Sequence, residues 1–402
     1  MIVFVGLSHL SLCYSASALT KGKKIVILDF EEIIFKYKNK ELNIYENGLE
    51  KIQKKFSKNL SYSSDFEILK KAEMIFLAKD TETNNKNEYK LKYVDKLVRK
   101  IEKYKSRVPL IIMNQVPVGY TRKVEWYDNY KYHFIETLIF GNAIERALYP
   151  ERIILGKPNI NTKINQKLLN FLKKYNCPIF EMLYEESELN KMFINLILAS
   201  QVSLTNYMNE ICIKNNLNWD TIKNSLQKDK RIGNKSYLSP GLGISGGNIE
   251  RDLENLSKIT IDKKINFPKL FLKFSDFKKD KLLNCLNNNF VLKKHTNVCI
   301  LGLRYKNDSL SIKNSPSLRY KKYLEKKCNL LINDRKLDSM SKKLKITMHD
   351  LNYVQKRSDI VILMNDDYTK NEIKNFKKCK LIIDPFKILY NLKFKNSKIV
   401  HI

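Results

Sequence analysis

The stretch IVFVGLSHLSLCYSASALTKGKKIVILDF, residues 2–30, decides the fold of this chain. It begins with a β-branched apolar run that ends in Gly6, continues with apolar side chains at helical spacing, and closes with a second apolar run, KKIVILDF. This pattern predicts a strand, a helix and a second strand. Further strand candidates, MIFLAKD, VPLIIMNQ and HFIETLIF, alternate with helical segments. Such alternation favours a parallel sheet with helices on both faces.

The remaining sequence predicts a helical middle and a second α/β unit. Residues 185–216 have the pattern of one long helix without Pro or Gly, and a loop rich in Gly, Ser and Pro, SYLSPGLGISGGNIERD, follows further on. After about residue 290, NVCILGL repeats the character of IVFVGL, with CNLLIND, DIVILMN and CKLIIDP as later strands. The predicted fold class is α/β, with two parallel-sheet domains joined by a long central helix. We place the domains at residues 1–184, 185–290 and 291–402.

Composition narrows the classes of function. The 402 residues carry a formal net charge of +32, but lysine and asparagine are spread along the whole length without one dense arm, so we attribute most of the excess to compositional drift rather than to a nucleic-acid partner. A basic protein still favours a polyanionic small ligand such as a nucleotide diphosphate. No run reaches the roughly 18 apolar residues of a membrane-spanning helix, and no basic segment precedes the apolar N-terminus, so we expect a cytoplasmic protein without membrane insertion. Seven scattered cysteines without metal-ligand spacing predict reduced thiols and no metal site.

Six segments resemble, in the right order, the nucleotide-sugar 6-dehydrogenase family, which includes UDP-glucose dehydrogenase. They are IYENGLEKI (44–52), QVPVGYTRK (115–123), YPERIILG (149–156), ESELNKMFINLILA (186–199), KDKRIG with SPGLGISGGNIERD (228–252), and GLRYKNDSLSIKNSPS (302–317). Six ordered segments between residues 44 and 317 are a specific signal. The resemblance implies two Rossmann-like domains, the first binding NAD and the last a UDP-sugar. It also implies a helical dimerisation region and a homodimer.

The cofactor site is expected in the first domain. A dinucleotide fingerprint carries three glycines, for a tight turn, for close approach of the pyrophosphate and for helix packing. Gly6 keeps the first, whereas Ser8 and Ser11 replace the other two. Asp29, roughly 20 residues further on, fits the acidic residue that binds the adenosine ribose; the alternative is a solvated carboxylate at a strand end. With the resemblance, the cofactor-binding residues are Gly6, Ser8, Ser11, Asp29, Thr81 and Gln115.

The resemblance places two catalytic residues on the long helix and a third in HFIETLIF. Lys191 and Asn195 are four residues apart and project from one face. An ammonium and an amide there suit the stabilisation of an oxyanion that develops at C6 of the sugar; the alternative is two ordinary polar residues on an amphipathic helix. Glu136 matches a carboxylate that the family uses in proton transfer. The family's second glutamate corresponds to Phe140, and its threonine beside the active-site water corresponds to Gln115.

The loop GISGGNIERD departs furthest from the family. Aligning its glycines and Asp252 puts Asn248 where the family has a cysteine that attacks the C6 aldehyde, and an amide is not a nucleophile. Asp252 is retained as a candidate general base, with Arg251 in place of a neighbouring lysine. The predicted catalytic residues are therefore Glu136, Lys191, Asn195, Asn248 and Asp252.

The substrate-binding residues follow from the resemblance as well. Arg231 matches an arginine that reaches into the neighbouring subunit, Tyr237 lies over the nucleotide, and the glycines let the loop approach a diphosphate. Lys313 replaces an arginine and keeps its charge but not its bidentate fork. The complete set is Arg231, Tyr237, Gly243, Gly247, Lys306 and Lys313.

The leading hypothesis is an oxidoreductase that transfers hydride from C6 of a UDP-sugar to NAD, in the synthesis of surface polysaccharide precursors. Without the thiol it either stops at the aldehyde or oxidises an aldehyde hydrate with Asp252 as base. The alternative is a catalytically degenerate paralogue that serves as a nucleotide-sugar-binding or scaffold protein. A third possibility, nucleic-acid binding driven by the net charge, predicts affinity that collapses with rising salt.

Overall fold

The structure is a computed structural model of the chain and describes all residues except 43, 85, 260, 261, 263, 306–309, 339, 340, 390, 391, 393, 395 and 396. The chain divides into two compact units, Met1–Ile194 and Asn195–Ile402. Each unit contains one large sheet, and the fold class expected from the sequence is confirmed. The three-part division at residues 184 and 290 stays a prediction.

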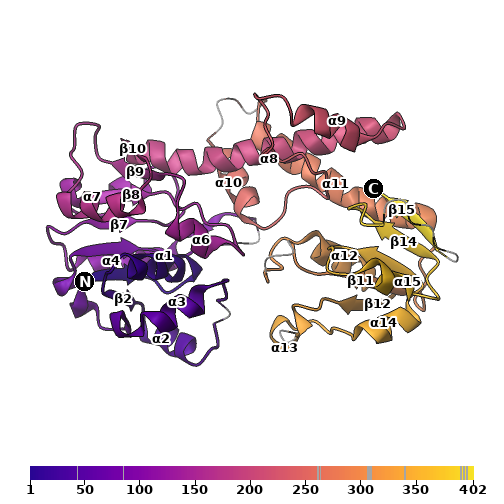
Figure 1. Ribbon diagram of the computed structural model, residues 1–402, viewed down its shortest axis with the longest axis horizontal. Helices are drawn as coiled ribbons and strands as arrows, with labels where there is room; N and C mark the ends of the chain where they lie inside the picture. The colour runs from indigo at the N-terminus through magenta and orange to yellow at the C-terminus, as the bar shows by residue number, and fades with distance from the viewer. Residues whose placement is uncertain are drawn as a thin grey trace. The chain divides into compact units, whose positions relative to one another are not determined.

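The first unit is built on an eight-stranded sheet of order β10-β9-β8-β7-β4-β1-β2-β3 (Figure 1). Its pairings are parallel except that of β8 with β9. The strands are β1 (Ile2–Val5), β2 (Ile25–Leu28), β3 (Leu60–Ser63), β4 (Met74–Leu77), β7 (Leu110–Ile112), β8 (Lys131–Phe134), β9 (Ile153–Lys157) and β10 (Ile179–Leu183). A short hairpin pairs β5 (Glu82–Thr83) with β6 (Tyr89–Lys90).

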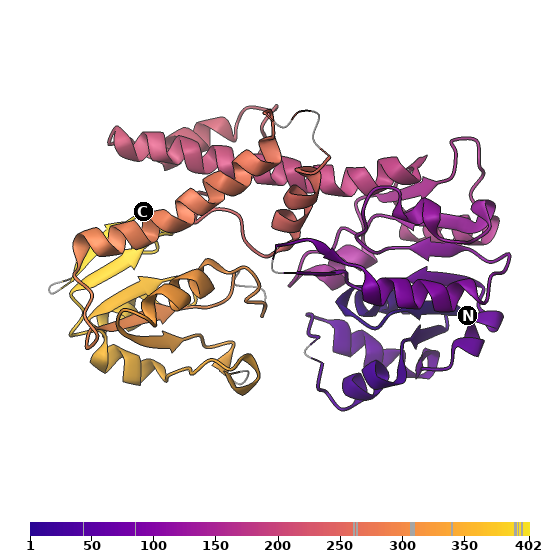
Figure 2. The same ribbon diagram turned by 180° about the vertical axis from the view of Figure 1, so that it is seen from behind.

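Both faces of this sheet are buried, because alternate residues of each central strand enter different clusters. Ile2 and Phe4 pack on the side of α1 (His9–Thr20), whereas Val3 and Val5 pack against α4 (Lys92–Glu102). Figure 2 shows α4 in front of the sheet when the chain is seen from behind. The remaining helices are α2 (Glu31–Lys38), α3 (Leu49–Lys55), α5 (Tyr120–Lys123), α6 (Ala143–Leu148) and α7 (Gln166–Leu172). Burial on both faces explains why the central strands are continuous apolar runs.

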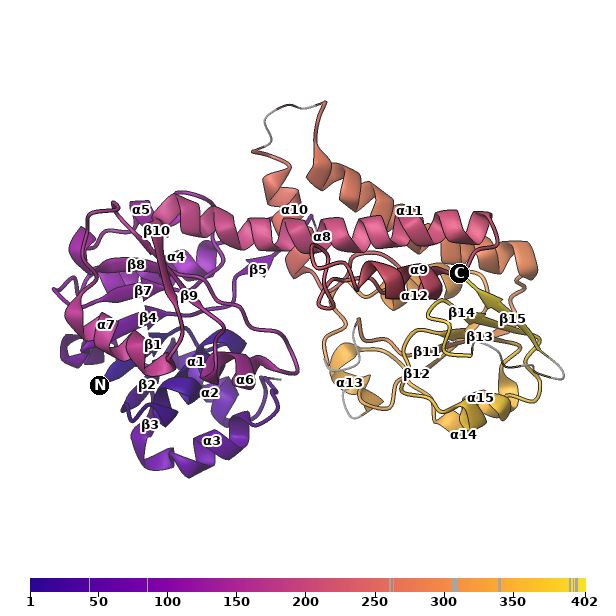
Figure 3. The ribbon, with the colours of Figure 1, turned by 45° about the horizontal axis from the view of Figure 1, so that its top comes forward.

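A long helix, α8 (Tyr184–Lys214), passes from the first unit into the second (Figure 3). The other helices of the middle region are α9 (Trp219–Leu226), α10 (Asn248–Leu256) and α11 (Phe267–Asn289). Large apolar side chains of α8 stay exposed in the single chain: Phe193, Ile197, Leu204, Tyr207 and Ile211. No helix among the described residues is long and apolar enough to cross a membrane.

The second unit contains a parallel five-stranded sheet of order β12-β11-β13-β14-β15. Its strands are β11 (Asn297–Leu301), β12 (Asn329–Asn333), β13 (Ile360–Leu363), β14 (Leu381–Asp384) and β15 (Lys398–His401). The helices around it are α12 (Pro316–Leu324), α13 (Ser341–Leu344), α14 (Leu351–Arg357) and α15 (Lys370–Lys374). Val298 and Cys299, successive residues of β11, enter different apolar clusters, so this sheet too is buried on both faces.

The two sheets repeat one turn. After β1, Gly6 has φ +96° and the amide of Leu7 donates to the carboxylate of Asp29 over 2.6 Å. After β11, Gly302 has φ +101° and the amide of Leu303 donates to Asp334 over 2.7 Å. In each sheet the carboxylate follows the neighbouring strand, and a positive φ of this size is one that glycine tolerates best. The sequence similarity of IVFVGL and NVCILGL therefore reflects a repeated structure.

Candidate active site

The turn between β1 and α1 keeps Gly6 for a steric reason. A Cβ at Gly6 would lie 2.6 Å from Cβ of Lys79, the second residue after β4. Ser8 precedes α1, and its amide donates to Oγ of Ser11 while Oγ of Ser11 donates to the carbonyl of Ser8, both over 3.0 Å. The side chain of Ser11 thus bonds the backbone of Ser8, the residue that precedes α1.

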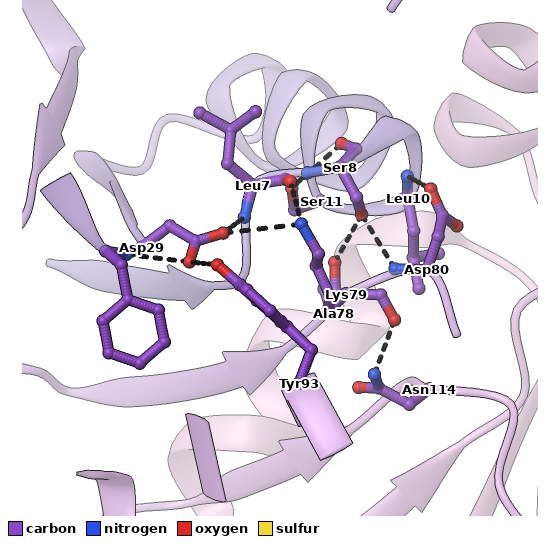
Figure 4. Close-up of polar contacts among 11 residues, drawn as sticks. Leu7, Ser8, Leu10, Ser11, Asp29, Ala78, Lys79, Asp80, Tyr93 and Asn114 are labelled. Carbon is purple, nitrogen blue, oxygen red and sulfur yellow. Dashed lines mark hydrogen bonds and ion pairs between the residues drawn. The ribbon is translucent and has the colours of Figure 1, made fainter. Parts of the chain in front are cut away.

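The hydroxyl of Ser8 joins this turn to the end of β4 (Figure 4). Its Oγ donates to the carbonyl of Ala78 and accepts from the amide of Asp80, both over 3.0 Å. A carboxylate oxygen of Asp80 lies 3.4 Å from the amide of Leu10 in the first turn of α1. Thr81 follows and is buried. A side-chain anion of the chain therefore lies beside the helix N-terminus where a pyrophosphate is expected.

Asp29 is fully buried and is not a solvated carboxylate at a strand end. Oδ2 accepts from the amide of Leu7 over 2.6 Å, and Oδ1 accepts from the amide of Phe30 over 2.8 Å and from the hydroxyl of Tyr93. Nζ of Lys79 lies 3.6 Å from Oδ2. The carboxylate thus accepts three hydrogen bonds and faces an ammonium, which nearly exhausts its acceptor capacity.

Glu136 lies at the centre of a polar cluster in the first unit. Nζ of Lys191 lies 2.8 Å from Oε1 of Glu136 and also donates to its carbonyl over 2.9 Å. Nε2 of Gln115 donates to the same Oε1 over 2.8 Å, and the amide of Leu138 donates to Oε2. Both Lys191 and Glu136 are largely buried. They line a pocket together with Tyr89, Met113, Asn114 and Gln115.

A second polar cluster lies in the second unit. Nδ2 of Asn195 donates to Oδ2 of Asp252 over 2.5 Å, and Nε of Arg251 donates to Oδ1 over 2.8 Å. All three side chains are buried. Nη1 of Arg251 also donates to Oδ1 of Asn248 over 3.4 Å. Both oxygens of the carboxylate that the sequence suggests as a base are therefore occupied by buried side chains of the chain itself.

Asn248 is the first residue of α10 and is exposed. Gly247 precedes it with φ +86°. The two cysteines nearest in sequence lie elsewhere, Cys212 in α8 beside Trp219 and Cys285 within α11. Burial raises the pKa of the Cys285 thiol and, more strongly, those of Cys13, Cys299, Cys328 and Cys379. These thiols are therefore protonated at neutral pH and are not activated nucleophiles.

The glycine-rich loop before α10 packs closely on α11 and on the side chain of Lys313. A Cβ at Gly243 would lie 2.6 Å from Oγ of Ser275, and one at Gly247 would lie 3.0 Å from Cε of Lys313. Lys313 thus runs across the start of α10. Lys306 lies outside the described residues.

Two further predicted substrate residues are exposed. Tyr237 is half-exposed, and its carbonyl accepts from the hydroxyl of Thr205. Arg231 is almost fully exposed and pairs with Asp229 over 2.6 Å. Because no ligand accompanies the chain, the roles of the predicted site residues stay predictions.

Sequence reasoning missed three residues of these clusters. Lys79 and Tyr93 contact Asp29, and Glu250 of α10 pairs with Lys279 of α11 over 2.9 Å. A signal existed for Lys79, because it follows a buried strand and the carboxyl ends of parallel strands meet at one edge of the sheet. No comparable signal marked Tyr93 or Glu250. Among the described residues, no group of three or more His, Cys, Asp or Glu could hold a metal ion.

Solved structures share this fold over the whole chain. The structure of a UDP-glucose dehydrogenase from Pyrobaculum islandicum matches with a TM-score of 0.84 and 20% identity, covering 100% of this chain and 96% of that one. That of a UDP-D-ManNAc dehydrogenase from Pyrococcus horikoshii matches with a TM-score of 0.83 and 17% identity, covering 100% and 99%. The chain therefore has the fold of the nucleotide-sugar dehydrogenases.

Two sequence matches narrow this class to a family. Residues 1–186 match the NAD-binding domain of the UDP-glucose/GDP-mannose dehydrogenase family, and residues 185–275 match its central domain. The chain belongs to this family. The UDP-glucose 6-dehydrogenase of Campylobacter jejuni is 28% identical over 388 residues, covering 93% of this chain and 96% of that protein. Protein MJ1054 of Methanocaldococcus jannaschii is 30% identical over 328 residues, and the match spans 77% of this chain but only 36% of that protein.

The cofactor is NAD, and the residues of the first unit fit it except at two points, which concern the carboxylates of Asp80 and Asp29. The glycine turn at Gly6 and the first turn of α1 provide the backbone geometry that a pyrophosphate needs. Asp29 has the correct position for the adenosine ribose, but donors of the chain itself surround its carboxylate. One exception is thus the Asp80 carboxylate beside the first turn of α1, and the other concerns the ribose subsite.

Proposed function

We propose that this chain oxidises the C6 primary alcohol of a UDP-sugar to the aldehyde, in the synthesis of surface polysaccharide precursors. Bound NAD supplies the hydride acceptor. The observation that carries the proposal is the contact of Lys191 with Glu136, which holds an ammonium and a carboxylate 2.8 Å apart at the edge of a pocket. Oxidation of an alcohol removes a proton from oxygen and a hydride from carbon. Lys191 and Glu136 are the residues that act at the oxygen.

Lys191 and Glu136 have different roles at the O6 atom. The carboxylate of Glu136 accepts the hydroxyl proton, and the ammonium of Lys191 stabilises the negative charge that develops on O6 while the C6–H bond breaks. Gln115 and the amide of Leu138 hold the carboxylate in place. This fixed arrangement needs little reorganisation during the reaction.

The aldehyde is the expected product because the second oxidation lacks its usual nucleophile. Asn248 cannot form the thiohemiacetal from which a second hydride would leave. Oxidation of an aldehyde hydrate would need a base, and the nearest candidate in the loop, Asp252, is fully buried between Arg251 and Asn195, whereas Glu136 lines a pocket. The absence of a thiol at Asn248 and the enclosure of Asp252 thus favour a reaction that stops after two electrons, at the aldehyde.

The test is incubation with UDP-glucose and NAD, with mass analysis of the nucleotide sugar and a hydroxylamine trap for the aldehyde. We expect one reduced nicotinamide per trapped aldehyde and no uronic acid. The Asn248→Cys variant is expected to form acid with two reduced nicotinamides per sugar, whereas Asn248→Ser, the matched control, is not. Acid formation by the unaltered chain would contradict the two-electron proposal, and no reduced nicotinamide with any UDP-sugar would contradict the activity itself.

The enclosure of Asp29 favours the second candidate, a nucleotide-sugar-binding or scaffold protein without turnover. A ligand that binds the native state raises the melting temperature. Separate melting curves with NAD and with UDP-sugars distinguish the two candidates. A shift with UDP-glucose but none with saturating NAD would favour the scaffold.

A further inference from the structure

The side chains of Lys79 and Tyr93 enclose the carboxylate of Asp29 from two elements (Figure 4). Lys79 follows β4, and its Nζ donates to the carbonyl of Leu7 over 2.8 Å while it lies 3.6 Å from Oδ2 of Asp29. The same Nζ lies 4.7 Å from the centre of the Tyr93 ring. Only 15% of the Lys79 side chain is exposed. The ammonium is therefore held by three partners rather than extended into solvent.

Tyr93 contributes from α4 and fixes the other carboxylate oxygen. Its hydroxyl donates to Oδ1 of Asp29. Burial, and then this hydrogen bond, raise the pKa of Tyr93 well above its ordinary value. The phenol therefore stays protonated and remains a donor over the whole physiological range.

The ammonium of Lys79 faces the remaining acceptor position of Asp29, on Oδ2, so a ribose hydroxyl that donates to this carboxylate must displace Lys79 or one of the three donors. Two of the donors are backbone amides, of Leu7 in the turn and of Phe30 at the end of β2, and these cannot move without unfolding the turn. The two that can rotate away are the side chains of Lys79 and Tyr93. Removing a charge-assisted contact from a buried carboxylate costs free energy, and this cost lowers the net affinity for the ligand.

We propose that Lys79, supported by Tyr93, closes the adenosine-ribose subsite and so determines the affinity of this chain for NAD. The dinucleotide binds fully only when the ammonium leaves Asp29. The inference rests on NAD as the cofactor, as the proposed function does, but it concerns binding alone and needs no turnover.

The attraction of Lys79 for the pyrophosphate of NAD has the opposite effect on affinity, because it favours binding. It is the smaller one, because the ammonium already faces a buried carboxylate and because one charge among a net +32 changes the long-range field little. Truncation of Lys79 is therefore expected to strengthen binding rather than weaken it.

The experiment is calorimetric titration of the full chain with NAD. Lys79→Ala is expected to lower the Kd by about tenfold, the order expected for one ionic contact with a buried carboxylate. Tyr93→Phe, which keeps the ring, is expected to give a smaller gain. The matched control is Lys21→Ala, which removes an ammonium 5.1 Å from the ring of Tyr175 beyond the other end of α1, and its Kd should equal that of the unaltered chain.

Two further titrations locate the effect at the ribose. ADP-ribose carries the same adenosine ribose as NAD, so Lys79→Ala should lower its Kd as well. Nicotinamide mononucleotide lacks this ribose, so its Kd should not change. In an Asp29→Asn background, Lys79→Ala should not lower the Kd for NAD further. Residue 29 is then a neutral amide, so the ammonium of Lys79 no longer pairs with a carboxylate there.

The inference is overturned if Lys79→Ala and Tyr93→Phe both leave the Kd for NAD unchanged or raise it. It is also overturned if the gain appears equally with nicotinamide mononucleotide. Circular dichroism melting of each variant checks that the first unit is folded. A lower Kd of Lys79→Ala for NAD, together with no oxidation of any UDP-sugar, would support this inference and contradict the proposed function. The two proposals are therefore tested separately.

Discussion

Glu136 accepts from an ammonium, a side-chain amide and a backbone amide, each from a different part of the first unit. Such a carboxylate is oriented in advance. If it takes the proton from O6, its replacement should affect the chemical step more than substrate binding.

Glu136→Gln is expected to lower kcat by about 10²- to 10⁴-fold, the usual contribution of a positioned base, with little change in the Kd for UDP-glucose. Steady-state rates and calorimetry measure the two quantities. Glu181→Gln is the matched control, because Glu181 is also paired with a lysine, Lys157, in the same unit but outside the polar cluster. Retention of kcat within a few-fold would show that Glu136 only positions Lys191.

His133 gives the first unit a pH-dependent stability. It is buried in β8, its Nδ1 lies 2.6 Å from the hydroxyl of Ser187, and burial lowers its pKa to about 4. The unfolded chain takes up the proton near pH 6.5, before the folded chain does. The stability contributed by the neutral ring is thus complete above pH 6.5 and is lost as the pH falls from 6.5 towards 4.

We expect the free energy of unfolding of the first unit to fall by about 3 kcal/mol across this window, at about 1.4 kcal/mol per pKa unit. The His133→Gln variant should lose most of this pH dependence. Trp126 lies in the first unit and Trp219 in the second, so denaturant unfolding followed by tryptophan fluorescence in a Trp219→Phe background reports on the first unit. An unchanged pH profile in the variant would assign the effect to other groups.

The helix α8 presents one apolar face that the single chain leaves uncovered. Phe193, Ile197, Leu204 and Ile211 are between 45% and 59% exposed, and their spacing places them along one side of the helix. Exposed apolar stripes of this kind mark protein–protein contacts. The occupant that we propose is a second copy of the chain, as the family resemblance implies.

A double variant, Leu204→Lys with Ile211→Lys, is therefore expected to be monomeric where the unaltered chain is dimeric. Light scattering after size-exclusion chromatography measures the mass. Val291→Lys is the matched control, because Val291 is 75% exposed but follows α11 and is not part of the α8 face. A monomeric unaltered chain, or a double variant that remains dimeric, would contradict the proposed homodimer.

At the scale of the whole molecule, the sequence predicted the arrangement of sheets and helices well. The runs around Gly6 and Gly302 give strands buried on both faces because continuous β-branched segments have few alternatives in an α/β chain. The positions of Glu136 and Lys191 followed from family motifs, and the structure brings them together. These predictions rest on strong local patterns.

The contacts that alter the chemistry were not predictable in the same way. Tyr93 reaches Asp29 from a position 64 residues away, through the packing of α4 on the sheet. The pairing of Arg251 with Asp252 depends on side-chain rotation between neighbouring residues of one helix. Neither leaves a periodic signal, because each depends on the direction of one side chain after the elements have packed.

The repeated turn also bears on how the chain folds. The contact of Leu7 with Asp29 joins residues 22 apart, and that of Leu303 with Asp334 joins residues 31 apart. Contacts of short sequence separation cost little loop-closure entropy and can form early. Each unit contains one such contact within its own residues, and we therefore expect the first sheet to begin assembling during synthesis, before the second unit has left the ribosome.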